Sequence, residues 1–346
     1  MDPAALIPTP DAIPVHWGWF QLLLSLTFFL HILLMNVMFG TAFIALVSHV
    51  RGDNASSPCA EAISRTLPFT IAFTVNFGVA PLLFVQVLYG HLMYVSSILI
   101  AVFWLSIVAL LFGAYSLAYV YKYRYAYLGN RRFLVIGLIT MLLLIIAFIF
   151  VNNLTLMQEP ARWNRYFDQH QGLLLNLADP MLLPRYLHFM VSAVAVGGLA
   201  IAFSFYWQRG KNDPAAKHWI ASGCRWFSYA TLVNFIIGLW FLTSLPTGLL
   251  TTSNTTGQFL LFTLGSGILF AIAAVVFGVS HRVIPALSCT LATIALMIAA
   301  RSLLRTSLLA PWFSVAQSPL APSYPPLFFF LFFLIAGLAL IVWMVR

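Results

Sequence analysis

The chain has 346 residues, of which 62% are hydrophobic and only 7% are charged. Soluble globular proteins carry about 25% charged residues, so this composition excludes a water-soluble fold and a disordered chain. The formal net charge of +9 raises the question of a nucleic-acid partner. Unbroken apolar runs of about 20 residues indicate membrane helices rather than the short alternating strands of a barrel. We therefore expect an all-α integral membrane protein.

About nine apolar segments are long enough to cross a bilayer as helices. The first is much longer than the hydrocarbon core requires, and we expect it to tilt or to project beyond the membrane. In chain order the predicted spans are 17–48, 67–89, 92–120, 133–153, 185–207, 222–245, 258–279, 282–304 and 325–345.

The basic residues gather in alternate connections between these spans. By the positive-inside rule, this distribution places the N-terminus outside and the C-terminus in the cytoplasm. Topology then accounts for the +9 charge, so we expect no nucleic-acid partner. The residues on the predicted cytoplasmic side are Arg51, Arg65, Lys122, Arg124, Arg131, Arg132, Arg209, Lys211, Lys217, Arg225, Arg282 and Arg346. An outer aromatic belt is predicted from Trp17, Trp19, Trp163 and Trp312.

The acidic residues all lie outside the predicted spans. The chain has eight Asp and Glu residues, and each falls in a connection or near the N-terminus. Proteins that conduct protons through a membrane usually carry carboxylates inside it. The pattern therefore argues against a proton pump or a proton-coupled transporter.

The first and fifth spans resemble each other. His31 is followed nine residues later by Gly40, and His188 is followed nine residues later by Gly197. The small residues after each histidine would let a flat macrocycle or a neighbouring helix approach closely. The shared spacing predicts that the two histidines occupy equivalent positions.

The second and sixth spans extend the repeat. Asn76 and Asn234 each lie in a Val-Asn-Phe sequence, at nearly the same offset as the histidines. This symmetry predicts two pseudo-repeated four-helix bundles in the same orientation, an outer loop between them and one further helix. The predicted units are 17–153, 154–184 (the loop), 185–304 and 325–345.

Histidines inside apolar helices need a partner, and neutral imidazole is a common ligand of haem iron. We predict that His31 and His188 are ligands of haem b, with two or more haems in the chain. The alternative is that each ring is hydrogen-bonded to a helix carbonyl or to a neighbouring asparagine. His91 and His16, near the outer surface, are weaker ligand candidates.

Arg301 and Arg305 lie four residues apart at the outer end of the eighth span. Arginine pairs bidentately with carboxylates, so these two residues are candidates to hold haem propionates. The alternative is that their side chains extend to the membrane interface.

Taken together, these residues make the chain resemble subunit I of the cytochrome bd oxidase superfamily. The family implies a bacterial inner membrane, His31 as an axial ligand in a buried high-spin haem pair, and His188 as an axial ligand of a low-spin haem. The matching segments are His31 with Gly40, Asn76–Ala80 through Tyr89–Gly90, Met157–Pro160, His188 with Gly197, and Arg301.

The sequence also departs from this family. A carboxylate of its second helix falls at Gln86 here, a haem-ligating glutamate near Ile298, and a ligating methionine near Thr263. The outer loop that oxidises quinol is reduced to about residues 246–257. These departures imply that quinol oxidation, proton delivery and oxygen chemistry are missing or replaced.

The resulting hypothesis is a haem-b membrane cytochrome subunit that passes electrons within a respiratory complex. We expect other membrane subunits and a periplasmic c-type cytochrome as partners, docking on loop 154–184, in a lipid bilayer. A quinone is a further candidate partner. One alternative is a divergent bd-type terminal oxidase subunit whose donor site lies on another subunit. The other is a haem-free subunit that anchors its partners.

Overall fold

The computed structural model describes residues 2–345 except 53–56, 169 and 210–212. Nine helices in this part of the chain are long and apolar enough to cross a membrane, which confirms the predicted all-α membrane class. They are α1 (Trp17–Val50), α2 (Ser57–Leu99), α3 (Ala101–Tyr123), α5 (Arg132–Met157), α6 (Leu182–Arg209), α7 (Pro214–Thr243), α8 (Thr255–Val279), α9 (Val283–Leu309) and α10 (Pro325–Val345). The short α4 (Tyr125–Leu128) and η4 (Pro160–Phe167) lie in connections.

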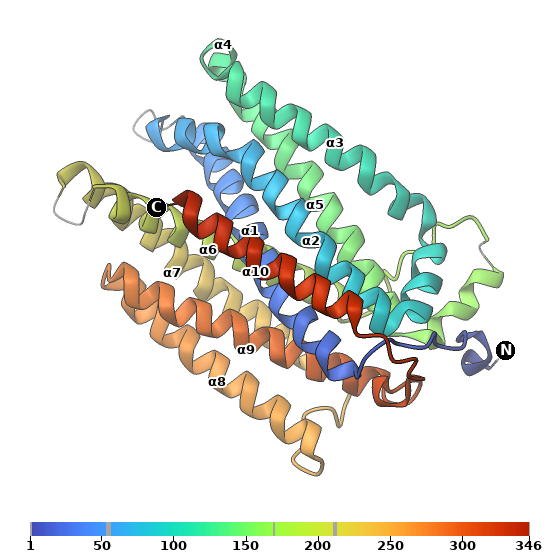
Figure 1. Cartoon of the computed structure of the whole chain (residues 1–346). Coiled ribbons are helices and arrows are strands. Elements are labelled where there is room, and N and C mark those ends of the chain that lie inside the picture. Colours follow the sequence, from blue (N-terminus) through green and yellow to red (C-terminus); the bar gives the residue numbers. More distant parts are fainter. Residues whose placement is uncertain (1, 53–56, 169, 210–212, 346) are drawn as a thin grey trace.

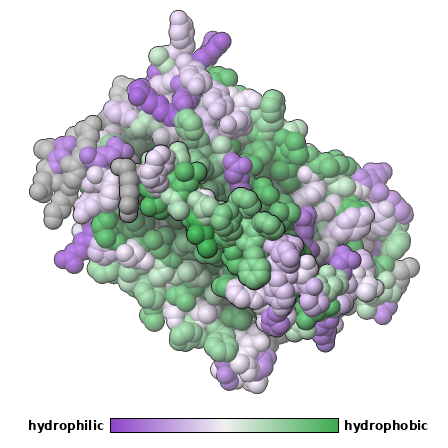
Figure 2. Space-filling model, in the orientation of Figure 1, coloured by the Kyte–Doolittle hydropathy of each residue, from purple (hydrophilic) through white to green (hydrophobic). Residues whose placement is uncertain are grey.

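The exterior of the bundle is apolar, as Figure 2 shows over the visible face. Large hydrophobic side chains are exposed along the spanning helices, for example Phe112 on α3 and Ile236 on α7. A patch of this size on a water-soluble protein would cause association. Here it matches a hydrocarbon environment, because lipid tails are as apolar as these side chains.

α1 and α6 form the centre of the molecule. α1 packs on α2, α5 and α6, whereas α6 packs chiefly on α7 and α1. The peripheral pairs are α3 with α5 and α8 with α9. Figure 1 shows the nearly aligned helices, with the N-terminus at one end of the bundle and the C-terminus at the other.

The two glycines of the sequence repeat meet at the crossing of α1 and α6. A Cβ atom added to Gly40 would lie 2.8 Å from the Cα of Gly197, and one added to Gly197 would lie 2.5 Å from the carbonyl carbon of Gly40. Only glycine allows this backbone approach, which is typical of packed membrane helices. Helix packing is therefore one role of the small residues. The division into two four-helix units stays a prediction.

The boundary between the second and third spans was predicted wrongly. α2 continues to Leu99, with a kink at Tyr89, and α3 begins at Ala101. The predicted break at residues 90–91 is the kink within α2. His91 consequently lies in the last turns of α2 and not at the start of α3.

Two extended segments cover the N-terminal end of the bundle. The N–H of Ile13 donates to the carbonyl of Pro319 at 2.8 Å, and the N–H of Ala321 donates to the carbonyl of Ile13 at 3.0 Å. Ile13 and the neighbouring Val15 are buried. This bridge ties the segment before α1 to the linker between α9 and α10.

Candidate functional site

His31 lies in the middle of α1, and its half-buried ring faces α2. Its Nδ1 atom is 3.0 Å from the carbonyl oxygen of Thr74. Because a carbonyl can only accept, Nδ1 carries the hydrogen and donates it, which leaves the Nε2 lone pair free in the neutral ring. The predicted alternative, a ring hydrogen-bonded to a helix carbonyl, is thus met at His31. The same bond is compatible with a haem ligand, because this tautomer can ligate a metal through Nε2 while a backbone acceptor fixes the ring.

Two further residues fix the place of the His31 ring. A Cβ atom on Gly78 of α2 would lie 2.9 Å from the Cε1 atom of His31, so the ring lies directly against the glycine backbone. On the α1 side, the Phe28 ring centroid is 6.3 Å from that of His31. The ring is therefore held between a glycine and an aromatic side chain.

His188 on α6 has a similar setting. A Cβ atom on Gly238 of α7 would lie 3.3 Å from the Cε1 atom of His188. The Phe241 ring stacks near the histidine, with 6.5 Å between centroids. The Nδ1 atom of His188 is buried and makes no hydrogen bond of good geometry among the described residues, although the backbone of Asn234 is near the ring. Each repeated histidine thus faces a glycine of the next helix.

Three arginines lie near one another: Arg185 at the start of α6, and Arg301 and Arg305 towards the C-terminal end of α9. The Arg301 guanidinium carbon is 4.5 Å from the Phe28 ring centroid, and that of Arg305 is 4.5 Å from the ring of Tyr89. Arg185 and Arg305 are close enough to act electrostatically on Arg301. The predicted arginine pair therefore belongs to a larger positive cluster that reaches both helices bearing the histidines.

Arg305 is the most informative member of this cluster. It is only 2% exposed, and its Nε and Nη1 atoms have no hydrogen-bond partner within the described residues. A buried cation that lacks hydrogen-bond acceptors is costly, and cluster members repel one another. An anionic group bound here, such as a carboxylate, would supply the missing acceptors. The predicted alternative of an extended, interfacial side chain is wrong for Arg305.

The two weaker histidine candidates differ in their settings. His16 is exposed, and its Nδ1 atom accepts the N–H of Gly18 at 3.1 Å, so it caps the start of α1. His91 packs against Phe313 with 4.4 Å between ring centroids, and its Nε2 atom is buried without a partner in the described structure. Of the two, only His91 keeps the character of a candidate ligand.

Asn76 and Gln86 lie on α2 but not at the His31 contact. Both side chains are exposed, and neither makes a hydrogen bond within the described residues. The residues of α2 that meet His31 are Thr74 and Gly78. Gly78 lies within the segment that carries the family resemblance, but neither residue was predicted to belong to the site. One acts through its backbone carbonyl and the other through its missing side chain, so neither has a distinctive sequence signal.

Trp163 does not belong to an outer aromatic belt. It is 1% exposed, and its Nε1–H donates to the carbonyl of Leu156 at 2.9 Å. η4 is folded onto the end of α5 through this side chain. The predicted role of Trp163 at the membrane surface is therefore wrong.

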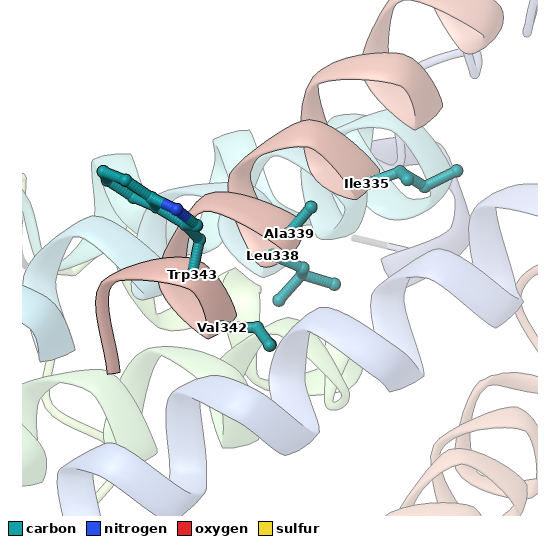
Figure 3. A pocket seen from close by; sticks show the side chains of 5 residues that line it. All are labelled: Ile335, Leu338, Ala339, Val342 and Trp343. Carbon is teal, nitrogen blue, oxygen red and sulfur yellow. The ribbon is translucent and has the colours of Figure 1, made fainter. Parts of the chain in front are cut away.

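The groove in Figure 3 is not the site. Its lining side chains all come from α10, and they are Ile335, Leu338, Ala339, Val342 and Trp343. They offer an apolar surface that suits a lipid chain. No group of three or more His, Cys, Asp or Glu side chains in the described residues could hold a bare metal ion. Haem iron needs only one or two protein ligands, which isolated histidines can provide.

The fold and the site together define a multi-helix membrane protein with a half-buried histidine on each of its two central helices. No protein-family model matches the chain, and no curated protein matches it. A chain of the bd oxidase from Geobacillus thermodenitrificans has the same fold, with a TM-score of 0.71. The match covers 99% of this chain and 96% of that chain at 12% sequence identity. The resemblance drawn from the sequence is thus confirmed at the level of the fold.

Proposed function

We propose that the chain is a haem-b membrane cytochrome subunit that passes electrons within a larger complex. The observation that carries this proposal is the His31 ring, whose Nδ1–H is donated to Thr74 while Nε2 stays free. His31 and His188 would each hold a haem iron, and bound haem would supply one-electron transfer. His91 would be a further ligand, and Gln86 and Asn76 are not assigned a role.

The arginine cluster supports the same proposal. Haem b carries two propionate groups, and Arg301 and Arg305 would hold these carboxylates through charge-assisted hydrogen bonds. The unpartnered Nε and Nη1 atoms of Arg305 are the donors that such a ligand requires. The guanidinium groups would also stabilise the added negative charge of a reduced centre, because opposite charges attract strongly in a low-dielectric site.

The proposed partners follow from the placement of these residues. The cluster lies towards the N-terminal side, which the basic residues predict to be the outer side of a bacterial inner membrane. We propose that other membrane subunits accompany the chain and that a periplasmic c-type cytochrome exchanges electrons with it near residues 154–184. A quinone remains a candidate partner in the bilayer.

The test is a haem assay on the purified full chain and two variants. We expect haem b in the wild type by the pyridine haemochrome assay, and about one haem less in each of His31→Ala and His188→Ala. His218→Ala, which removes an exposed histidine, is the matched control and should keep the full haem content. A pure chain without haem b would exclude this function and leave the haem-free anchor.

A divergent terminal oxidase is the second candidate, because the fold is that of a bd oxidase chain. In that case the site that receives electrons from the donor would lie on another subunit. Oxygen uptake by the purified complex, lost in His31→Ala and kept in His218→Ala, would favour this candidate. A complex that shows only six-coordinate haem spectra and does not respond to cyanide would count against it.

A further inference from the structure

Two carboxylates, one buried and one half-buried, lie where α5, η4 and the start of α6 meet, just outside the spanning segments. The more buried one is Asp179, which is 3% exposed. Its Oδ1 atom accepts the N–H of Met181 at 2.8 Å, whereas its Oδ2 atom is buried and has no hydrogen-bond partner among the described residues. A buried carboxylate oxygen without a donor is unfavourable, and binding a proton would relieve this cost.

Glu159 is the other carboxylate, and its contacts differ. Its Oε2 atom is 2.6 Å from the Nε atom of Arg162 and accepts the side-chain N–H of Asn176 at 2.9 Å. A paired and hydrogen-bonded carboxylate is stabilised in its charged form. Glu159 is therefore suited to remain ionised, and Asp179 is the member of the pair suited to bind a proton.

Arg185 connects these carboxylates to the His188 site. It is 9% exposed, donates to Oε1 of Gln158 at 3.2 Å and is attracted electrostatically by Asp179 and Glu159. On its other side, its guanidinium carbon lies 5.3 Å from the ring centroid of Phe241, which also stacks near His188. A change of charge at His188 would therefore be felt at Asp179 through Phe241 and Arg185, where little water screens it.

We propose that Asp179 is a proton-binding residue whose occupancy is coupled to the redox state of the His188 site. This inference rests on the proposed electron-transfer function. In the coupled step, with haem held by His188, one electron would pass to that haem from a c-type cytochrome, which would thereby be oxidised. Asp179 takes one proton from the aqueous phase on the N-terminal side, so that its carboxylate becomes a carboxylic acid. When the site is oxidised again, the electron would return to the cytochrome and Asp179 would release its proton to the same aqueous phase.

The electrostatics around Asp179 give this coupling its sign. Burial raises the pKa of Asp179 above its ordinary value of 3.8, and the Met181 N–H, Arg185 and Arg162 oppose that rise. Burial also raises the pKa of Glu159, and the neighbouring negative charge of Asp179 adds to that rise. An added electron makes the local potential more negative, which raises the pKa of Asp179 further. Proton uptake thus accompanies reduction, and reduction becomes easier as the pH falls.

The test uses the purified full chain with its haem, and two variants. Asp179→Asn keeps an oxygen that can accept the Met181 N–H but cannot bind the proton. Asp168→Asn changes an exposed carboxylate on the same loop and is the matched control. The first readout is the infrared C=O absorption of a protonated carboxyl group, followed from about pH 5 to pH 8. The second is the midpoint potential of the haem that His188→Ala removes, over the same range.

We expect the wild type and Asp168→Asn to show a protonated carboxyl band that grows on reduction, and a midpoint potential that falls as pH rises. Asp179→Asn should lose the band and show a flatter dependence on pH. A band that persists in Asp179→Asn, or an unchanged slope, would overturn the proposal. A chain without haem would instead overturn the proposed function and the coupling with it, while the infrared band would still decide whether Asp179 binds a proton.

Discussion

The position of the His31 ring depends on the absence of a side chain at Gly78. The position of a Cβ atom there is 2.9 Å from Cε1 and 3.0 Å from Nδ1 of His31, which is closer than real Cβ contacts allow. The ring itself is tied to Thr74 by a hydrogen bond through the same Nδ1 atom. An added methyl group therefore forces the ring to move and strains the bond that sets its tautomer.

For Gly78→Ala we expect a loss of about 1–3 kcal/mol in the free energy of unfolding, the usual cost of overpacking a core. We also expect an altered absorption spectrum for the haem that His31 would hold, because its ligand is reoriented. Thermal unfolding and optical spectroscopy of the purified protein measure the two effects.

Gly90→Ala is the matched control on the same helix, since a Cβ atom at Gly90 has nothing within 4 Å. We expect it to leave the spectrum unchanged and to be neutral or slightly stabilising, because alanine loses less backbone freedom on folding. If both variants behaved alike, the contact between Gly78 and His31 would not matter to the site.

At this scale the sequence identified candidate residues but not their contacts. His31 and His188 stood out because polar residues are rare inside apolar helices. Their neighbours did not, because the Thr74 carbonyl is a group that every residue has. The location of Trp163 was predicted wrongly for a related reason. An indole serves equally at a membrane surface or in a core, and only its bond to Leu156 decides between them.

At the scale of the helices, α1 and α6 are held together by backbone contact at one crossing. A Cβ atom on Gly40 would lie 2.8 Å from Gly197 Cα and 2.9 Å from the carbonyl carbon of Ala193. These are backbone atoms, which cannot rotate away as a flexible side chain could. The crossing therefore fixes the distance between the helices that bear His31 and His188.

We expect Gly40→Ala to cost about 3 kcal/mol or more in the free energy of unfolding, at the upper end for overpacked positions. The separation of the helices should also lower the haem content at both histidines. Gly337→Ala on α10 is the control, since a Cβ atom there meets nothing within 4 Å. A Gly40→Ala protein that unfolds at the wild-type temperature would show that the helices do not cross this closely.

The number of helices could be predicted from the sequence, but one boundary could not. The turn between α2 and α3 lies at Leu99 and Ile100, which are apolar and buried and give no turn signal. It is stabilised from far along the chain, because the N–H of Leu174 donates to the Leu99 carbonyl and that of Val102 to the Gly172 carbonyl. The glycine at position 90 marks a kink, although glycine is also typical of turns.

At the scale of the whole molecule, the acidic residues lie outside the predicted spans, but not all of them are exposed to water. The described spanning helices apart from the start of α2, which carries Glu61, contain no carboxylate. Asp179 is nevertheless buried and Glu159 half-buried, both close to the ends of the spanning helices and within the electrostatic reach of Arg185. An acidic residue outside the spans can therefore still be shielded from water, because the loop of residues 154–184 folds back onto the bundle.

The orientation of the molecule in the membrane remains a prediction from its basic residues, and exposed positions at the two ends can test it. Asp168 and Lys217 are both exposed, near η4 and at the start of α7 respectively. In intact cells, a membrane-impermeant maleimide should label Asp168→Cys and should not label Lys217→Cys until the membrane is opened. Cys59 and Cys224 are buried, so a variant with Cys289 replaced by serine gives a low background. The reverse labelling pattern would invert the topology and move the proposed cytochrome partner to the other side.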